Sequence, residues 1–180
     1  MRKNYSSEGI ILSRRDFGEA DRTIWVYTKD RGRICLLAKG VRRPKSKKRG
    51  HLEIFSHIKF SVNASHGIDV MTETETIDSF GIIRKDLPRV SLAYYFMEVV
   101  GRLTHGQEKN EELFDHILEY LKKLKTFKQL KVLRNEFCTQ TLVIMGFWPK
   151  EKELKDPDTF LEEIVERKIS AIRVGKRLLL

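Results

Sequence analysis

The periodicity of apolar residues changes once along this chain of 180 residues, near position 80. Before that position, apolar and polar residues alternate in short runs, as they do in β-strands with one buried face. After it, apolar residues recur every three or four positions, as they do on one face of an α-helix. We therefore expect an α+β fold, with a β domain over residues 1–80 and an all-α helical domain over residues 81–180.

Five short strands are expected in the β domain. Turn-forming residues separate several of them, including Asp30-Arg31-Gly32 and the segment 63–67. The expected strands span residues 7–13, 22–28, 33–38, 53–62 and 68–78. Five strands of this length, joined by tight turns, match the strand number and size of an OB-like β-barrel.

Four helices are expected in the second domain, because residues typical of helix ends separate its apolar stripes. Asp86-Leu87-Pro88, Asn110 and Asp156-Pro157 are typical of helix starts. A further helix is expected over residues 128–145, and Gly146 is typical of its end. The stripes indicate a shared helical core rather than a cofactor site.

The segment Lys39–Arg49, between the third and fourth expected strands, is strongly basic. Seven of its eleven residues are lysine or arginine and none is acidic. Because like charges repel one another, we expect an extended and mobile loop when no partner is bound. Each phosphate that such a loop neutralises releases counterions, so the pattern favours binding to a nucleic-acid backbone. The net charge of +10 also favours a polyanionic partner.

The residues expected to contact the backbone belong to this loop and to other parts of the β domain. In the loop they are Lys39, Arg42, Arg43, Lys45, Ser46, Lys47, Lys48 and Arg49. Elsewhere in the β domain they are Arg14, Arg15 and Arg33. Ser46 is included because its hydroxyl can donate a hydrogen bond to a phosphate oxygen.

Binding of a single strand is also favoured by aromatic side chains on which bases stack. The aromatic residues available in the β domain are Trp25, Tyr27, Phe55 and Phe60. Aromatic residues in strands more often belong to a core, so each of them has two interpretations.

No catalytic pattern stands out in the sequence. The histidines are scattered, and the Gly-x-x-x-x-Gly-Lys-Ser/Thr motif of ATP-driven motors is absent. The two cysteines, Cys35 and Cys138, cannot form a four-ligand zinc site, and we expect reduced thiols. Glu73, Glu75 and Asp78 could bind a metal ion in a nuclease, although a solvated strand face is the plainer interpretation. We expect no cofactor and no enzymatic activity.

The sequence contains no apolar run long enough for a membrane span and no signal peptide after its basic start. We therefore expect a cytoplasmic protein that does not contact membranes.

Four segments of the β domain resemble the N-terminal barrel of the bacterial recombination mediator family RecO. They are Glu8–Leu12, Phe17–Arg22, Tyr27–Gly32 and Ala38–Ser46, the last of which resembles the Lys-Gly-x-Arg-x-x-x-Ser segment of that family. In the helical part, Met145–Pro149 resembles the end of a family helix. The four-cysteine zinc module that many members carry has no counterpart here, so the likeness is to a short form without the zinc-binding cysteines.

The resemblance implies an OB-fold joined to a helical domain and a role in DNA repair and recombination, in the RecF pathway. It implies binding of single- and double-stranded DNA, strand annealing, and assistance in loading RecA onto DNA coated by single-strand-binding protein. The implied partners are RecR and the tail of single-strand-binding protein, with RecA involved indirectly. The implied location is the bacterial cytoplasm, at the nucleoid.

Three other functions are compatible with the residues alone. The first is an RNA-binding OB-fold protein linked to translation, since the basic loop does not distinguish RNA from DNA. The second is a metal-dependent nuclease that uses Glu73 or Asp78. The third is a protein adaptor that acts through its helical domain, for which no salt-dependent affinity for nucleic acid is expected.

Overall fold

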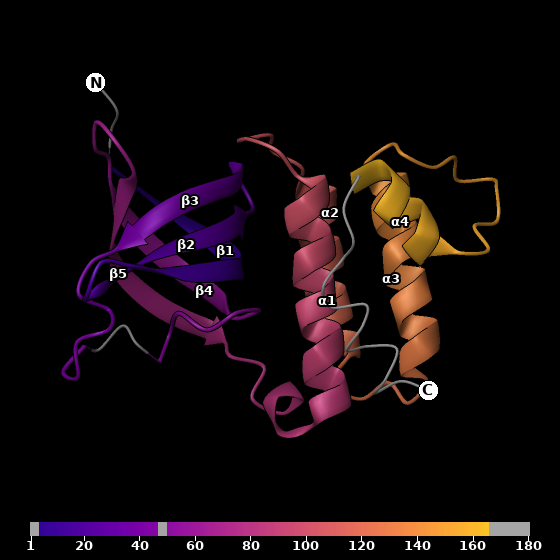
Figure 1. Cartoon of the computed structure of the whole chain (residues 1–180), viewed down its shortest axis with the longest axis horizontal. Coiled ribbons are helices and arrows are strands. Elements are labelled where there is room, and N and C mark those ends of the chain that lie inside the picture. The colour runs from indigo at the N-terminus through magenta and orange to yellow at the C-terminus, as the bar shows by residue number, and fades with distance from the viewer. Residues whose placement is uncertain (1–3, 47–49, 166–180) are drawn as a thin grey trace. The chain divides into compact units, whose positions relative to one another are not determined.

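The computed structural model describes residues 4–46 and 50–165 of the chain (Figure 1). Its first part consists of β-strands and its second part of helices, in the order that the apolar periodicity predicts. Contacts between Cα atoms divide the chain into two compact units. The first unit extends to Ser79 and also contains His105–Asn110, whereas Phe80–Thr104 and the described residues from Glu111 onward form the second.

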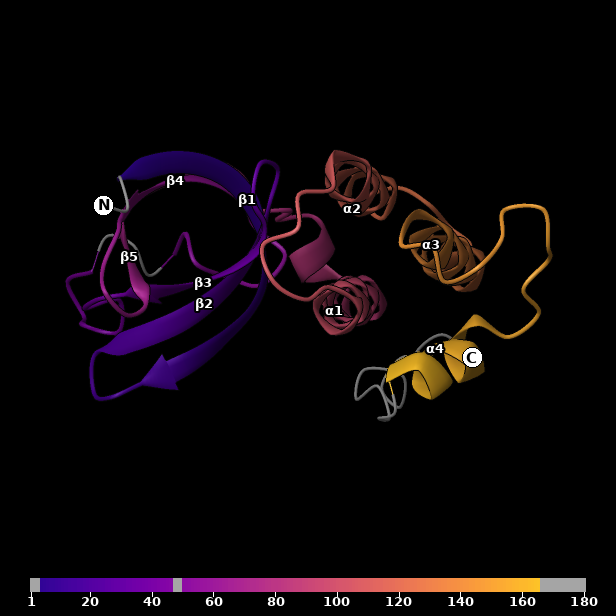
Figure 2. The ribbon, with the colours of Figure 1, turned by 90° about the horizontal axis from the view of Figure 1, so that it is seen from above.

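The first unit is a closed barrel, which Figure 2 shows as a ring of strands. The strands are β1 (Tyr5–Phe17), β2 (Asp21–Thr28), β3 (Gly32–Ala38), β4 (His57–Asn63) and β5 (Asp69–Asp78). Around the barrel they follow the order β1-β2-β3-β5-β4. The strands β3 and β5 run parallel, whereas the other neighbours are antiparallel. The expected OB-like barrel and the α+β fold class are therefore confirmed.

The long strand β1 pairs with two neighbours and thereby helps to close the barrel. Its residues Tyr5–Ile10 pair with β4, and its residues Gly9–Phe17 pair with β2. The register of the second pairing shifts between Ile11 and Ser13. Irregularities of this kind bend a strand and increase its twist, which allows β1 to pass from one neighbour to the other.

Alternate residues of the strands point into the barrel and form its apolar core. The buried residues of this core are Ile11, Ile24, Val26, Ile34, Leu36, Ala38, Val41, Leu52, Ile58, Phe60, Val62 and Met71. Val41 and Leu52 belong to the connection between β3 and β4 rather than to a strand. Full burial of an aliphatic side chain contributes about 1.5–3 kcal/mol, so these two residues hold both ends of that connection against the barrel.

The fourth strand begins later than the alternation predicts. We expected a strand over residues 53–62, but β4 begins at His57. Phe55 has a φ of 58°, a left-handed conformation that is incompatible with a strand. Its amide donates a hydrogen bond to the carbonyl of Ile11 at 2.8 Å, and its side chain is fully buried. The chain therefore turns inward at Phe55 before β4 starts.

The second unit consists of four α-helices preceded by a short 3-10 helix. These elements are η1 (Ile83–Lys85), α1 (Leu87–Leu103), α2 (Glu111–Lys123), α3 (Leu130–Ile144) and α4 (Pro157–Val165). The carboxylate of Asp86 accepts a hydrogen bond from the amide of Arg89 at 3.2 Å and caps α1 as expected. Gly146 follows α3 with a φ of 76°, the conformation typical of a helix end. Among the described residues, none of the helices is both long and apolar enough to cross a bilayer.

Aromatic rings from three helices form the centre of the helical core. Phe96 of α1 stacks on Phe137 of α3 with 3.9 Å between ring centroids. His116 of α2 stacks on the same phenylalanine at 4.9 Å, and Tyr120 meets it edge to face at 5.3 Å. Because His116 is buried among these rings, its pKa is lowered to about 4. The imidazole is therefore neutral at physiological pH.

The fourth helix is held to the rest of this unit by a buried ion pair. The guanidinium of Arg134 in α3 lies 2.7 Å from the carboxylate of Asp158 in α4. The hydroxyl of Tyr95 in α1 donates to the same carboxylate at 2.7 Å. These contacts link α1, α3 and α4 through one acidic side chain.

Candidate nucleic-acid interface

The described part of the basic loop, Lys39–Ser46, folds into two consecutive turns rather than an extended segment. The amide of Arg43 donates to the carbonyl of Gly40 at 3.1 Å, and the amide of Ser46 donates to the carbonyl of Arg43 at 3.0 Å. Our expectation of an extended loop is wrong for this part, because the burial of Val41 in the barrel core fixes the chain at its first turn. We call Lys39–Ser46 the basic turn.

Gly40 allows the basic turn to begin directly after β3. Its φ of 67° lies in the left-handed region that glycine adopts without strain. Its amide donates to the carboxylate of Asp21, at the start of β2, at 2.7 Å. The turn is therefore tied to the neighbouring strand as well as to the core.

A second set of hydrogen bonds ties Arg42 to the hairpin between β1 and β2. Its amide donates to the carbonyl of Ala20 at 2.9 Å, and its guanidinium donates to the carbonyl of Gly18 at 3.0 Å. The same guanidinium lies 3.4 Å from the carboxylate of Asp16. Arg42 is consequently a fixed part of the turn and is only partly exposed.

Asp16 is an acidic residue within the basic surface, by which we mean the basic turn together with Arg15 and Arg22. Its carboxylate accepts a hydrogen bond from Nε of Arg22 at 2.8 Å and also contacts Arg42. The hydrogen bond from Arg22, together with the positive charges of Arg42 and Arg22, lowers the pKa of Asp16. The carboxylate therefore remains ionised and neutralises part of the charge of two arginines.

The structure brings several of the expected backbone-binding residues together. Lys39, Arg43 and Lys45 are exposed on the basic turn, and Ser46 is partly buried there. Arg15 is exposed on β1, where it pairs across the hairpin with Thr23. These residues lie at one end of the barrel strands. Lys47, Lys48 and Arg49 lie outside the described residues.

Two of the expected arginines have partners within the barrel. Arg14 lies 2.5 Å from the carboxylate of Glu53 and donates to the carbonyl of Leu52 at 3.3 Å. Arg33, on β3, places its guanidinium over the ring of Trp25 at 4.4 Å from the ring centroid. Burial lowers the pKa of Arg33. Through its contacts with Glu53 and Leu52, Arg14 helps to attach the connection that precedes β4.

Neither Arg22 nor Asp16 is among the backbone-binding residues predicted from the sequence, although both belong to this surface. The signal was nevertheless present, since Asp16 and Arg22 are directly opposite each other in the β1–β2 hairpin. Opposite charges at such cross-strand positions attract one another. The contact of Asp16 with Arg42, in contrast, depends on the tertiary fold.

Only one of the four aromatic candidates for base stacking lies on the outside of the barrel with part of its ring accessible. Tyr27, Phe55 and Phe60 expose 1%, 0% and 2% of their surfaces, which is too little for contact with a base. Trp25 is partly buried and does not belong to the barrel core.

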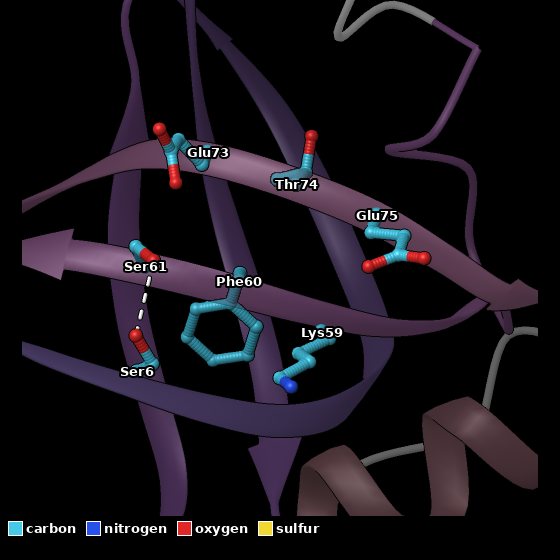
Figure 3. Close-up of a pocket in the computed structure, with 7 residues that line it drawn as sticks. All are labelled: Ser6, Lys59, Phe60, Ser61, Glu73, Thr74 and Glu75. Atoms are coloured by element: carbon cyan, nitrogen blue, oxygen red, sulfur yellow. Dashed lines mark hydrogen bonds between the residues drawn. The ribbon is translucent and has the colours of Figure 1, made fainter.

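Two of the three acidic residues considered for a nuclease, Glu73 and Glu75, line a pocket of the barrel surface (Figure 3). The pocket has a volume of about 320 Å³ and is lined by Ser6, Lys59, Phe60, Ser61, Glu73, Thr74 and Glu75. Lys59 is directly opposite Glu75 on the neighbouring strand. Asp78, the third acidic residue, does not line the pocket. Residues 4–46 and 50–165 contain no group of three or more His, Cys, Asp or Glu side chains placed to hold a metal ion.

The two cysteines are both free thiols and belong to different units. Cys35 is partly buried in β3, and Cys138 is buried in α3. Burial raises the pKa of both thiols, that of Cys138 to about 12. Neither thiol is therefore activated as a nucleophile.

Two family models match this chain. The model of the N-terminal part of recombination protein O matches residues 1–80, and the model of its C-terminal part matches residues 84–153. The first match covers the barrel and the basic turn, and the second covers α1, α2 and α3.

Several curated proteins are similar to the chain, and each is named DNA repair protein RecO. The protein of Pelotomaculum thermopropionicum is 32% identical over 147 residues, which are 82% of this chain and 57% of that protein. The protein of Roseiflexus sp. is 30% identical over 163 residues, 91% of this chain and 57% of that protein. That of Dehalococcoides mccartyi is 32% identical over 150 residues, 83% and 59% of the respective chains.

The chain thus spans less than two thirds of the length of these curated relatives. The matched region nevertheless includes the whole barrel and most of the helical unit. From the two family models and the relatives together, we conclude that this chain belongs to the RecO family.

Proposed function

We propose that this chain binds DNA through the basic turn and acts in DNA repair and recombination by holding strands rather than by making or breaking bonds. The observation that carries the proposal is the construction of the turn. Val41 fixes it to the barrel core, while Lys39, Arg43 and Lys45 are exposed on it. A cationic surface that is already ordered loses less conformational entropy when it binds a phosphate backbone.

The names of the relatives support the same proposal, since they are called DNA repair proteins. Following the family resemblance, we further propose that the chain anneals complementary strands and assists the loading of RecA. RecR and the tail of single-strand-binding protein are the proposed protein partners, and the bacterial cytoplasm is the proposed location. Contacts with a polyanionic backbone are independent of sequence, which suits a protein that acts wherever DNA is damaged.

The proposal is tested by reversing the three exposed charges of the basic turn, Lys39→Glu, Arg43→Glu and Lys45→Glu, in one chain. Binding of a fluorescent single strand is measured by anisotropy over a range of salt concentrations. We expect weaker binding and a plot of log K against log salt that is less steep by about 2. The reason is that about 0.7 counterions are released per phosphate contact, and three contacts are lost.

The matched control reverses three exposed lysines of the helical unit, Lys128→Glu, Lys131→Glu and Lys155→Glu. It changes the net charge by the same amount without altering the basic turn. If the affinity and the salt slope change equally with both sets of substitutions, or change with neither set, the proposed role of the turn is contradicted.

A further inference from the structure

We infer that Trp25 is a stacking platform for an unpaired nucleobase, so that the barrel contacts a single strand through a base as well as through phosphates. This role deepens the proposed DNA binding and rests on it. Its ligand is a nucleobase that is not paired with a complementary strand, because only such a base offers a free aromatic face.

The position of Trp25 on the outer face of the barrel is the first observation. Ile24 and Val26, its neighbours along β2, are fully buried in the barrel core. Since successive side chains of a strand point to opposite faces, the indole of Trp25 lies on the outside. It is directly opposite Ser13 of β1 and Cys35 of β3, which are both small.

The second observation is that Trp25 already takes part in a stack. The guanidinium of Arg33 lies over its ring, 4.4 Å from the ring centroid. Such contacts are favourable because the ring face is negative and the guanidinium is positive. Nucleobases stack on aromatic rings and on guanidinium planes alike. A base that joins this pair therefore extends an arrangement that exists before binding.

Tyr27 is the other aromatic residue on the same face of β2, and it is not available for stacking. The hydroxyl of Tyr27 donates to the carbonyl of Asn110 at 3.3 Å, and Tyr27 is buried. Gly32 lies so close to Glu108 that an added Cβ would be 2.1 Å from its carbonyl oxygen. The segment His105–Asn110 thus covers this end of the face, whereas Trp25 remains partly exposed.

The distance between Trp25 and the basic turn suits one bound strand. Trp25 is four residues from Asp21, whose carboxylate accepts the amide of Gly40 in the turn. At about 3.3 Å per residue, this corresponds to roughly 13 Å along β2. OB-folds bind about 4–16 nucleotides, so a single strand can contact the basic turn and the indole together.

Fluorescence provides the first test, because the chain contains only two tryptophans, Trp25 and Trp148. In the full chain with Trp148→Phe, emission comes from Trp25 alone, and we expect oligothymidylate to quench it as binding proceeds. In the full chain with Trp25→Phe, emission comes from Trp148 in the other unit, and we expect much less quenching. Emission from Trp25 that stays unchanged at saturation would overturn the stacking role.

Affinity provides the second test, with Trp25→Thr, which keeps a residue that favours strands. We expect about 5- to 150-fold weaker binding of oligothymidylate, the range for loss of one stacked base. An abasic oligomer of equal length carries the same phosphates without bases, and its affinity should not change. Equal loss for both oligomers would overturn the role of Trp25.

These measurements separate the two proposals. Tight, salt-dependent binding that is insensitive to Trp25 would remove the stacking role and leave the binding by the basic turn intact. Absence of any binding by the unsubstituted chain would overturn both. If Trp25→Thr unfolds the barrel, the quenching of Trp25 in the Trp148→Phe chain still decides the question.

Discussion

At the scale of single residues, Asp16 controls how much positive charge the basic surface offers to a ligand. Its carboxylate contacts Arg22 at 2.8 Å and Arg42 at 3.4 Å. A phosphate that binds either guanidinium must compete with this carboxylate. We therefore expect this surface to bind a polyanion less strongly than its count of lysines and arginines suggests.

We expect Asp16→Asn to strengthen the binding of single-stranded DNA. The substitution removes the competing negative charge, while the remaining amide oxygen can still accept a hydrogen bond from Arg22. The salt slope should become steeper, by about 0.7 for each arginine that gains a phosphate contact. Anisotropy titrations at several salt concentrations measure both quantities.

Glu19→Gln is the matched control for Asp16→Asn. Glu19 lies in the same hairpin and is exposed, and the structure shows no ion pair between it and another described residue. Its substitution changes the net charge equally. An equal gain in affinity for the two variants would mean that net charge, rather than release of Arg22 and Arg42, determines binding.

At the scale of secondary-structure elements, the contact between α2 and α3 makes the stability of the helical unit depend on pH. His116 of α2 is stacked on Phe137 of α3, and its Nε2 lies 3.0 Å from the hydroxyl of Thr141. Burial lowers the pKa of His116 from 6.5 to about 4. Between these values the unfolded chain binds a proton that the folded chain does not.

We therefore expect the free energy of unfolding to decrease as the pH falls from about 6.5 to about 4, by up to roughly 3 kcal/mol. The sign follows because protons bind preferentially to the unfolded state in this range. Urea unfolding followed by circular dichroism at several pH values measures the effect. His116→Gln, whose side chain does not titrate, should show a smaller decrease, and an identical pH dependence would contradict this account.

Elements and their order could be predicted from the sequence because they depend on local patterns. The alternation in residues 22–28 and the cap at Asp86 each act within a few residues, and the structure agrees with both. The start of β4 was misplaced because Phe55 turns inward to meet Ile11, which is distant in sequence. The shape of the basic turn depends in the same way on Val41 reaching the barrel core.

The candidate site was predictable only in part, for a related physical reason. A run of lysines and arginines is visible in any sequence, so the basic turn could be located. Whether an arginine is available for a ligand depends on its tertiary partners, such as Glu53 for Arg14. The same holds for aromatic residues, since the alternation of β2 does not reveal that Tyr27 is buried and Trp25 is partly exposed.

At the scale of the whole molecule, the net charge of +10 has two opposing effects on the proposed annealing of strands. Two complementary strands repel each other, and a cationic protein that neutralises both backbones reduces this repulsion. Binding that is too tight, however, would keep the bases from pairing. A stack on one residue, Trp25, engages few bases at a time and leaves most of them available for pairing.

We therefore expect the full chain to accelerate the annealing of complementary strands coated with single-strand-binding protein. Annealing is measured by the loss of fluorescence when a labelled strand pairs with a strand that carries a quencher. The triple charge reversal of the basic turn should abolish the acceleration, whereas the triple reversal at Lys128, Lys131 and Lys155 should retain most of it. The acceleration should also decrease as salt rises, since the contacts with phosphates are electrostatic.

Naked strands provide the comparison that separates charge neutralisation from action on coated DNA. If the chain acted only by neutralising phosphates, it would accelerate naked strands and leave coated strands unaffected, because the coating protein occupies the backbone. Acceleration with coated strands requires in addition that the chain gains access to the DNA beneath the coat, directly or by contact with the coating protein. If coated strands anneal at the same rate with and without the chain, the mediator role is contradicted. The binding by the basic turn is then judged separately, by its salt slope.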